Sequence, residues 1–276
     1  MRILVILQDK ISKSRAALIF SILCLLTGCH PCCVQDHYRT QYAHLEARDA
    51  TLKQQASIPE NEYSLTLLVD AKHLDYSNGD RLLSTIAKHP NGSRRRDVGH
   101  AWLVLSGVID GKRMRLEGGH SGERAISEPR YLDSILLNQS EPNPVRILFT
   151  TRSDGYFESG SGGHKPTYAI SIAITKEKFL TLYNWMTVPQ YPFTQYSFTE
   201  NQCTTFVVKA ASIAGLTLAS EAVVSIPPYV YLGGRRIRLW EDPCYSTITL
   251  HTPDLLEKSM IEAVLAGKAQ VALDKA

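Results

Sequence analysis

The sequence lacks internal repeats, low-complexity tracts and any apolar run long enough to cross a membrane. Its main apolar stretch near the N-terminus covers residues 16–26, whereas a spanning helix needs about 20 apolar residues. An excess of charge of one sign is also missing, because 30 basic residues are nearly balanced by 27 acidic residues. These absences argue against a repeat protein and against a spanning helix. They also give no general case for a nucleic-acid partner.

Cysteine is scarce outside the N-terminal region, where four of the six cysteines lie within ten residues. That spacing is no disulfide framework for a globular domain. Only Cys203 and Cys244 belong to the part that we expect to fold. In an oxidising compartment these two thiols are able to form a disulfide, which is the main structural alternative to a free thiol.

Metal-ligand spacings are missing from the folded part as well. Four of its residues have suitable side chains, but no C-x-x-C or H-x-x-x-H spacing links them: His100, His120, His164 and Cys203. We therefore expect no metal site and no cofactor. The 276 residues, 44% of them hydrophobic, are enough to bury one sizeable core with extensions.

The N-terminus has the pattern of a signal peptide. Lys10, Lys13 and Arg15 precede the short apolar run of residues 16–26, and small residues follow it. Leu26-Thr-Gly-Cys29 resembles the lipobox of bacterial lipoproteins. The resemblance implies that residues 1–28 are removed, that Cys29 is lipidated, and that the polar residues 29–58 form a tether. The protein would then be anchored to a membrane in the cell envelope and face the extracytoplasmic side.

A predicted helix begins just before Cys203. Phe206, Ala210 and Ile213 recur at helical spacing, and Gly215 suits the left-handed position after the last turn. Thr199 and Gln202 have the spacing of a capping box. A cysteine in the first turn lies at the positive end of the helix dipole, which favours the nucleophilic thiolate. A small buried core residue is the alternative interpretation, because free cysteine is often buried.

The clearest hairpin in the chain joins residues 98–109 to residues 112–117. Asp110-Gly111 between two strand-like runs is typical of a two-residue type I′ turn. Closing the hairpin there places Val104 opposite Glu117 and puts His100 and Val104 on one face. A bulge at Gly118-Gly119 would bring His120 onto the face of His100.

The remaining pattern predicts an α+β fold. We expect strands at 63–69, 145–150 and 168–174, a Gly/Ser-rich loop at 154–163, and strand-like stretches within 226–240. Short helices are expected near 82–86 and 131–137, a longer one after Thr175, and a terminal helix with Pro253 at its first position.

These parts allow nucleophilic chemistry at a thiol. Such a site needs a nucleophile, a base, a group that orients the base, and donors for the developing oxyanion. Cys203 is the candidate nucleophile and His100 the candidate base. His120, or else Glu117, is the candidate orienting residue.

Two motifs carry a resemblance to a known family. Gly99-His100-Ala-Trp at a strand start and Asn201-Gln-Cys203-Thr-Thr-Phe-Val207 at a helix start resemble the circularly permuted NlpC/P60 papain-like families. These include lecithin:retinol acyltransferase-like proteins and bacterial YaeF/YiiX-type proteins. In that permuted order the histidine strand comes first, a polar third residue follows on the next strand, and the cysteine helix comes last. The resemblance covers about residues 95–216.

The resemblance implies a papain-like domain over residues 59–276, with its core at 95–216 and N- and C-terminal extensions. An antiparallel sheet would pack against the cysteine-bearing helix. Tyr196 resembles a tyrosine that assists the oxyanion site in the family. Gln202, which stands where many members have Asn, is a further candidate for an oxyanion or orienting role. The implied reaction is attack of a thiolate on an amide or ester of a cell-wall peptide or a lipid. A catalytically inactive lipoprotein that binds peptides or lipids is the alternative.

Overall fold

A six-stranded antiparallel sheet forms the centre of the described chain. The computed structural model describes residues 45–53, 62–87, 89–92, 97–122, 134–187, 190–232 and 234–273. The strands follow the spatial order β10-β5-β1-β2-β3-β4. Their bounds are β1 Ser64–Asp70, β2 His100–Ile109, β3 Lys112–Ser121, β4 Tyr156–Ser159, β5 Tyr168–Ala173 and β10 Gln270–Val271.

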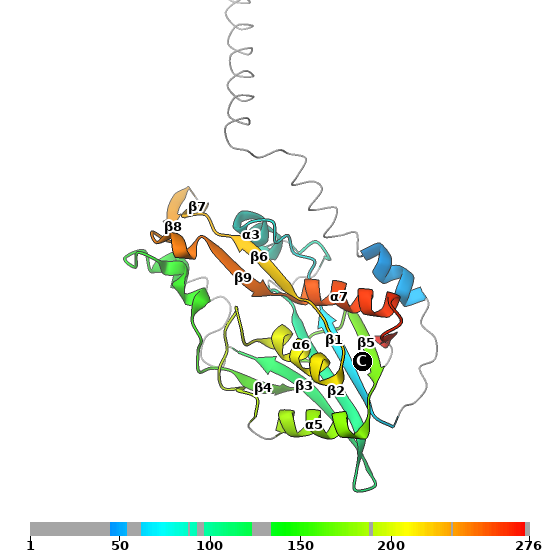
Figure 1. The fold of residues 1–276 in the computed structure, drawn as a ribbon. Coiled ribbons are helices and arrows are strands. Elements are labelled where there is room, and N and C mark those ends of the chain that lie inside the picture. Colours follow the sequence, from blue (N-terminus) through cyan, green and yellow to red (C-terminus); the bar gives the residue numbers. More distant parts are fainter. Residues whose placement is uncertain are drawn as a thin grey trace, which may run out of the picture. The chain divides into compact units, whose positions relative to one another are not determined.

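Helices cover one face of this sheet (Figure 1). They are α5 (Lys176–Thr187), α6 (Cys203–Ala214) and α7 (Pro253–Leu265). Alternate strand residues such as Leu67, Leu103 and Ile170 pack against them and form the main core. The opposite face carries a smaller cluster around Trp102 and Val104. The fold is therefore mixed α+β, with an antiparallel sheet packed against helices.

Two β-ribbons and short helices form a second hydrophobic cluster. β6 (Glu221–Ser225) pairs with β9 (Thr247–His251), and β7 (Tyr229–Leu232) pairs with β8 (Arg235–Arg238). The helices of this part are α3 (Gly79–Ala87), η1 (Pro144–Phe149) and η2 (Pro243–Tyr245), the last two of the 3-10 type. Both ribbons follow α6 in the chain, so they lie outside the predicted core at 95–216.

The predicted hairpin is confirmed, with its register. Asp110 (φ 50°) and Gly111 (φ 75°) both have positive φ, as a type I′ turn requires. Ile109 pairs with Lys112 and Val104 pairs with Glu117.

Two sequence predictions about elements were wrong. Residues 145–150 were expected to form a strand but lie in η1. Pro144 holds a helical φ at the start of η1, and the N–H of Val145 donates to the carbonyl of Leu239. Within the expected loop at 154–163, residues Tyr156–Ser159 form the strand β4, which pairs with β3.

Part of the expected tether is structured. Residues 45–53 are helical, and the hydroxyl of Thr51 lies 2.7 Å from that of Tyr168 on β5. Ala47 and Leu52 pack against the main core. The structural unit of Tyr42–Ala276 therefore begins before residue 59. The signal segment and Cys29 lie outside the described residues.

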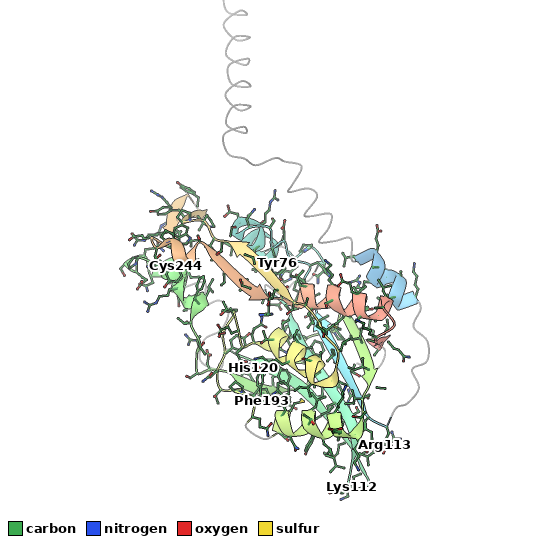
Figure 2. The ribbon with its side chains drawn as sticks, in the orientation of Figure 1. Tyr76, Lys112, Arg113, His120, Phe193 and Cys244 are labelled. Atoms are coloured by element: carbon green, nitrogen blue, oxygen red, sulfur yellow. The ribbon has the colours of Figure 1, made fainter. Side chains whose placement is uncertain are left out.

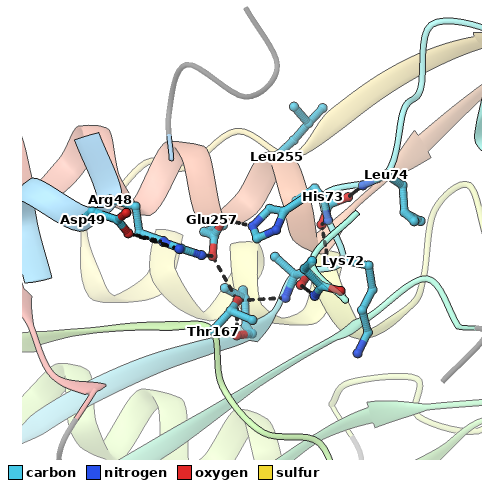
Figure 3. A network of polar contacts seen from close by, with 12 residues as sticks. Arg48, Asp49, Lys72, His73, Leu74, Thr167, Leu255 and Glu257 are labelled. Carbon is cyan, nitrogen blue, oxygen red and sulfur yellow. Dashed lines mark hydrogen bonds and ion pairs between the residues drawn. The ribbon is translucent and has the colours of Figure 1, made fainter. Parts of the chain in front are cut away.

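A buried polar network attaches α7 to the end of β1 (Figure 3). The carboxylate of Asp254 accepts hydrogen bonds from the N–H groups of Lys72, His73 and Leu74, at 2.7–2.9 Å. One turn later, Glu257 lies 2.8 Å from His73 Nε2 and accepts from Thr167. Asp254 and Glu257 are 2% and 0% exposed, so their bonds are shielded from water.

Candidate active site

Cys203 is the first residue of α6, and its side chain is 7% exposed. The preceding residue, Gln202, caps the helix: its Oε1 accepts from the N–H of Thr204 at 2.8 Å. The same oxygen accepts from the Cys203 thiol at 3.2 Å. The Nε2 group of Gln202 donates to the carbonyl of His251 on β9. The cap thus positions the thiol at the N-terminus of α6 and connects this end of the helix to the β6–β9 ribbon.

The capping box lies three residues later than the sequence predicted. Gln202 is the N-cap itself, and Thr205 returns the bond by accepting from the Gln202 N–H. Thr199 is not the cap, because the hydroxyl of Ser197 accepts from the N–H groups of Glu200 and Asn201 and closes a turn there. The predicted helix start before Cys203 and the left-handed Gly215 (φ 91°) are confirmed.

A cavity of about 310 Å³ opens where β2 begins, β3 ends and α6 begins. Cys203, Gln202 and Tyr196 line it from the α6 side. Residues from five other parts of the chain complete the wall, among them His100, His164 and His251. The structure therefore brings the predicted nucleophile and the predicted base to one cavity, of a size suited to a small ligand group.

His100 enters this cavity from the first position of β2 and is 6% exposed. Its Nε2 atom is buried and has no hydrogen-bond partner within the part of the chain that the structure describes. Burial, together with the nearby His164, lowers the pKa of His100 to about 3. The imidazole is consequently neutral at pH 7.

His164 stacks on His100, with ring centroids 4.8 Å apart. Its Nδ1 atom lies 2.7 Å from Asp70 Oδ2. The buried ammonium of Lys72 contacts the same carboxylate at 2.7 Å and lies 3.4 Å from Asp97. Burial raises the pKa of Asp70, but the hydrogen bonds from His164 and Lys72 outweigh that effect and lower it overall.

His120 does not line the cavity. β2 pairs with β3 in continuous register as far as Leu103–Gly118, and beyond that pair the ring of His120 packs against Tyr191 and Phe193 of the main core. Strand alternation therefore places His120 on the helix-covered face, opposite to His100. This corrects the prediction that a bulge brings the two histidines onto one face.

His120 instead belongs to a buried polar and aromatic cluster (Figure 2). Its Nε2 group bonds the carbonyl of Phe193 at 3.0 Å, and because a carbonyl only accepts, Nε2 carries the ring proton. Its Nδ1 atom lies 3.1 Å from the hydroxyl of Tyr191. Burial lowers the pKa of His120 to about 4.

Of the other two predicted site residues, Glu117 lies away from the cavity and Tyr196 lies at it. Glu117 pairs with Val104 on the hairpin, forms an ion pair with Arg115 at 2.9 Å, and does not line the cavity. Tyr196 does line it, and its ring also packs edge-on against His120 at 5.3 Å.

Sequence reasoning missed two cavity histidines. His164 follows the Gly-rich turn after β4, and the sequence suggested it only as a possible metal ligand. His251 ends β9, and its Nδ1 atom lies 2.9 Å from the hydroxyl of Ser220. Burial lowers the pKa of His251. No local pattern links either residue to Cys203, because only tertiary folding brings these segments together.

Cys203 and Cys244 do not form a disulfide. Cys203 is buried, whereas Cys244 is exposed and lies away from α6 (Figure 2). The disulfide alternative is therefore contradicted by the structure. Among the described residues, no group of three or more His, Cys, Asp or Glu side chains is arranged to hold a metal ion.

Comparison of the chain with protein-family models, with curated protein sequences and with solved structures gives no match. Within the described segments, no helix combines the length and apolar character needed to cross a membrane.

Proposed function

We propose that the protein is a membrane-anchored cysteine hydrolase or acyltransferase that acts on an amide or an ester through an acyl-thioester on Cys203. In this proposal His100 is the general base and the domain is a permuted papain-like fold. The substrate is a cell-wall peptide or a lipid, since lipidation at Cys29 would hold the enzyme beside both. The fold alone does not choose between these substrates.

One observation carries the proposal: a thiol at a helix N-terminus shares a cavity with a buried imidazole whose Nε2 atom has no hydrogen-bond partner among the described residues. Buried polar atoms are nearly always hydrogen-bonded, so the unpartnered Nε2 of His100 needs an explanation. A role of His100 as the acceptor of the Cys203 thiol proton would explain it.

The proposed reaction begins with the thiol that donates to Gln202 Oε1 at rest. His100 takes this proton while the sulfur attacks the carbonyl carbon. Both polar groups of the Gln202 side chain already have partners, the N–H of Thr204 and the carbonyl of His251. Gln202 is therefore better suited to hold the helix start than to bind an oxyanion. Tyr196, which also lines the cavity, remains the side-chain candidate for that role.

The test compares the reaction rates of the Cys203 and Cys244 thiols within one protein. The folded full-length chain is treated with iodoacetamide, and labelling of Cys203 and Cys244 is followed by peptide mass spectrometry. We expect Cys203 to react faster than the exposed Cys244, and His100→Ala to slow Cys203 about 100-fold. The rate at Cys244 should not change.

If Cys203 reacts only after unfolding, or if His100→Ala leaves its rate unchanged, the enzyme proposal is wrong. The cavity would then be a binding site for peptides or lipids.

A further inference from the structure

A chain of charged groups lies along the cavity wall next to the proposed base, with His164 and Asp97 lining the cavity at its two ends. It runs from His164 to Asp70, from Asp70 to Lys72, and from Lys72 to Asp97, with contacts of 2.7, 2.7 and 3.4 Å. Asp70 and Lys72 are 6% and 3% exposed. Such a buried group of ions is stable only when its charges are nearly balanced.

Charge balance in this chain depends on His164. Among the residues that the structure describes, two carboxylates and one ammonium leave one negative charge in this chain without a cation. A protonated His164 imidazole, in contact with Asp70, makes the cluster neutral. His100 has no carboxylate within hydrogen-bond distance and lies in a stack with His164, so a second proton on the pair would place two positive charges side by side.

We propose that the two stacked histidines divide the acid–base work of the site, with His100 as the general base and His164, held by Asp70, as the general acid. This inference rests on the proposed function of Cys203. Two neighbouring titratable groups in opposite electrostatic environments are the arrangement from which such separate roles follow.

In this division, each half-reaction begins and ends with one added proton on the pair. During acylation, the Cys203 proton moves to His100, the S–C bond forms, and the leaving amine or alcohol takes a proton from His164 as its bond to the carbonyl carbon breaks. During deacylation, water attacks the thioester and gives its proton to His164. The C–S bond then breaks, and the sulfur regains a proton from His100.

Leaving-group dependence tests the role of His164. The full-length protein is assayed with p-nitrophenyl acetate, phenyl acetate and ethyl acetate, which share one acyl group but differ in the basicity of the alcohol that leaves. A general acid matters most for a basic leaving group. We expect His164→Gln to lower the rate on ethyl acetate ~100-fold or more, and the rate on p-nitrophenyl acetate less than ~10-fold.

Asp70 is a positioning residue in this scheme. Asp70→Asn keeps a side-chain oxygen near Nδ1 but removes the negative charge, so it should steepen the same leaving-group dependence. Glu177→Gln, the same chemical change on the exposed face of α5, should have no effect. Circular dichroism of each variant separates a loss of fold from a loss of acid catalysis.

The outcomes are distinguishable. If the wild type forms an acyl adduct at Cys203 but His164→Gln lowers all three rates equally, or none of them, the assignment of His164 is overturned while the proposed function stands. If the wild type forms no adduct at Cys203, and Cys203→Ser changes no rate, both proposals are overturned.

Discussion

Gly99 determines how the chain enters β2 and therefore where His100 lies. Its φ is +87°, and a Cβ atom there would lie 2.2 Å from the carbonyl oxygen of Asp70. Gly99→Ala should destabilise the fold by about 3 kcal/mol or more, because it combines an unfavourable φ with a collision against backbone. Urea unfolding measures the change.

Gly92 is the matched control. Its φ is +77°, but no atom lies within 4 Å of an added Cβ. Gly92→Ala should therefore cost only about 1 kcal/mol. Equal losses in the two variants would show that the close approach of Gly99 to Asp70 is unimportant.

Gly118 and Gly119 make room for neighbouring side chains rather than for a bulge. A Cβ at Gly118 would lie 2.3 Å from the ring of Phe157 on one face of the sheet. A Cβ at Gly119 would lie 3.2 Å from His100 Nε2 on the other. The sequence pattern shows two glycines, but only the packed neighbours explain why a side chain is excluded at both positions.

At the scale of elements, α7 depends on Asp254. Asp254→Ala would leave three buried N–H groups, those of Lys72, His73 and Leu74, without their acceptor. Each unsatisfied buried donor costs about 1–3 kcal/mol, so we expect a loss of at least ~3 kcal/mol in the free energy of unfolding. Chemical denaturation followed by circular dichroism measures it.

Glu262→Gln is the control on the same helix. Glu262 is exposed, and its carboxylate makes only a long ion pair with Lys258, at 3.9 Å. Its replacement should therefore change stability by less than about 0.5 kcal/mol. A small effect at Asp254 would mean that water or a rearranged loop replaces the carboxylate.

At the scale of the whole molecule, buried histidines make stability depend on pH. Burial lowers the pKa of His120 to about 4 and that of His100 to about 3, from an ordinary value of 6.5. Between these values the unfolded chain binds more protons than the folded chain. The free energy of unfolding should therefore be fully retained above about pH 6.5 and fall as the pH drops toward 4, by about 3 kcal/mol for His120 alone.

His120→Gln tests this prediction, since it removes the titrating group from the cluster with Tyr191 and Phe193. Urea unfolding at several pH values should give a shallower dependence for the variant than for the wild type. Parallel curves would mean that other groups cause the acid sensitivity.

Elements with strong local signals could be predicted from the sequence. The hairpin turn at Asp110-Gly111, the start of α6 at Cys203 and the start of α7 at Pro253 follow from short-range chemistry of turns and caps. η1 could not be predicted, because its residues are good strand formers and a long-range contact with Leu239 decides their conformation.

Local chemistry is thus enough to place Cys203 and His100 at the beginning of their elements, because caps, turns and side-chain periodicity act over a few residues. It cannot show that His164, Asp70 and His251 lie beside them, or that His120 lies on the other face of the sheet. Those relations depend on strand register and on how distant segments pack, and such long-range contacts leave no short pattern in the chain.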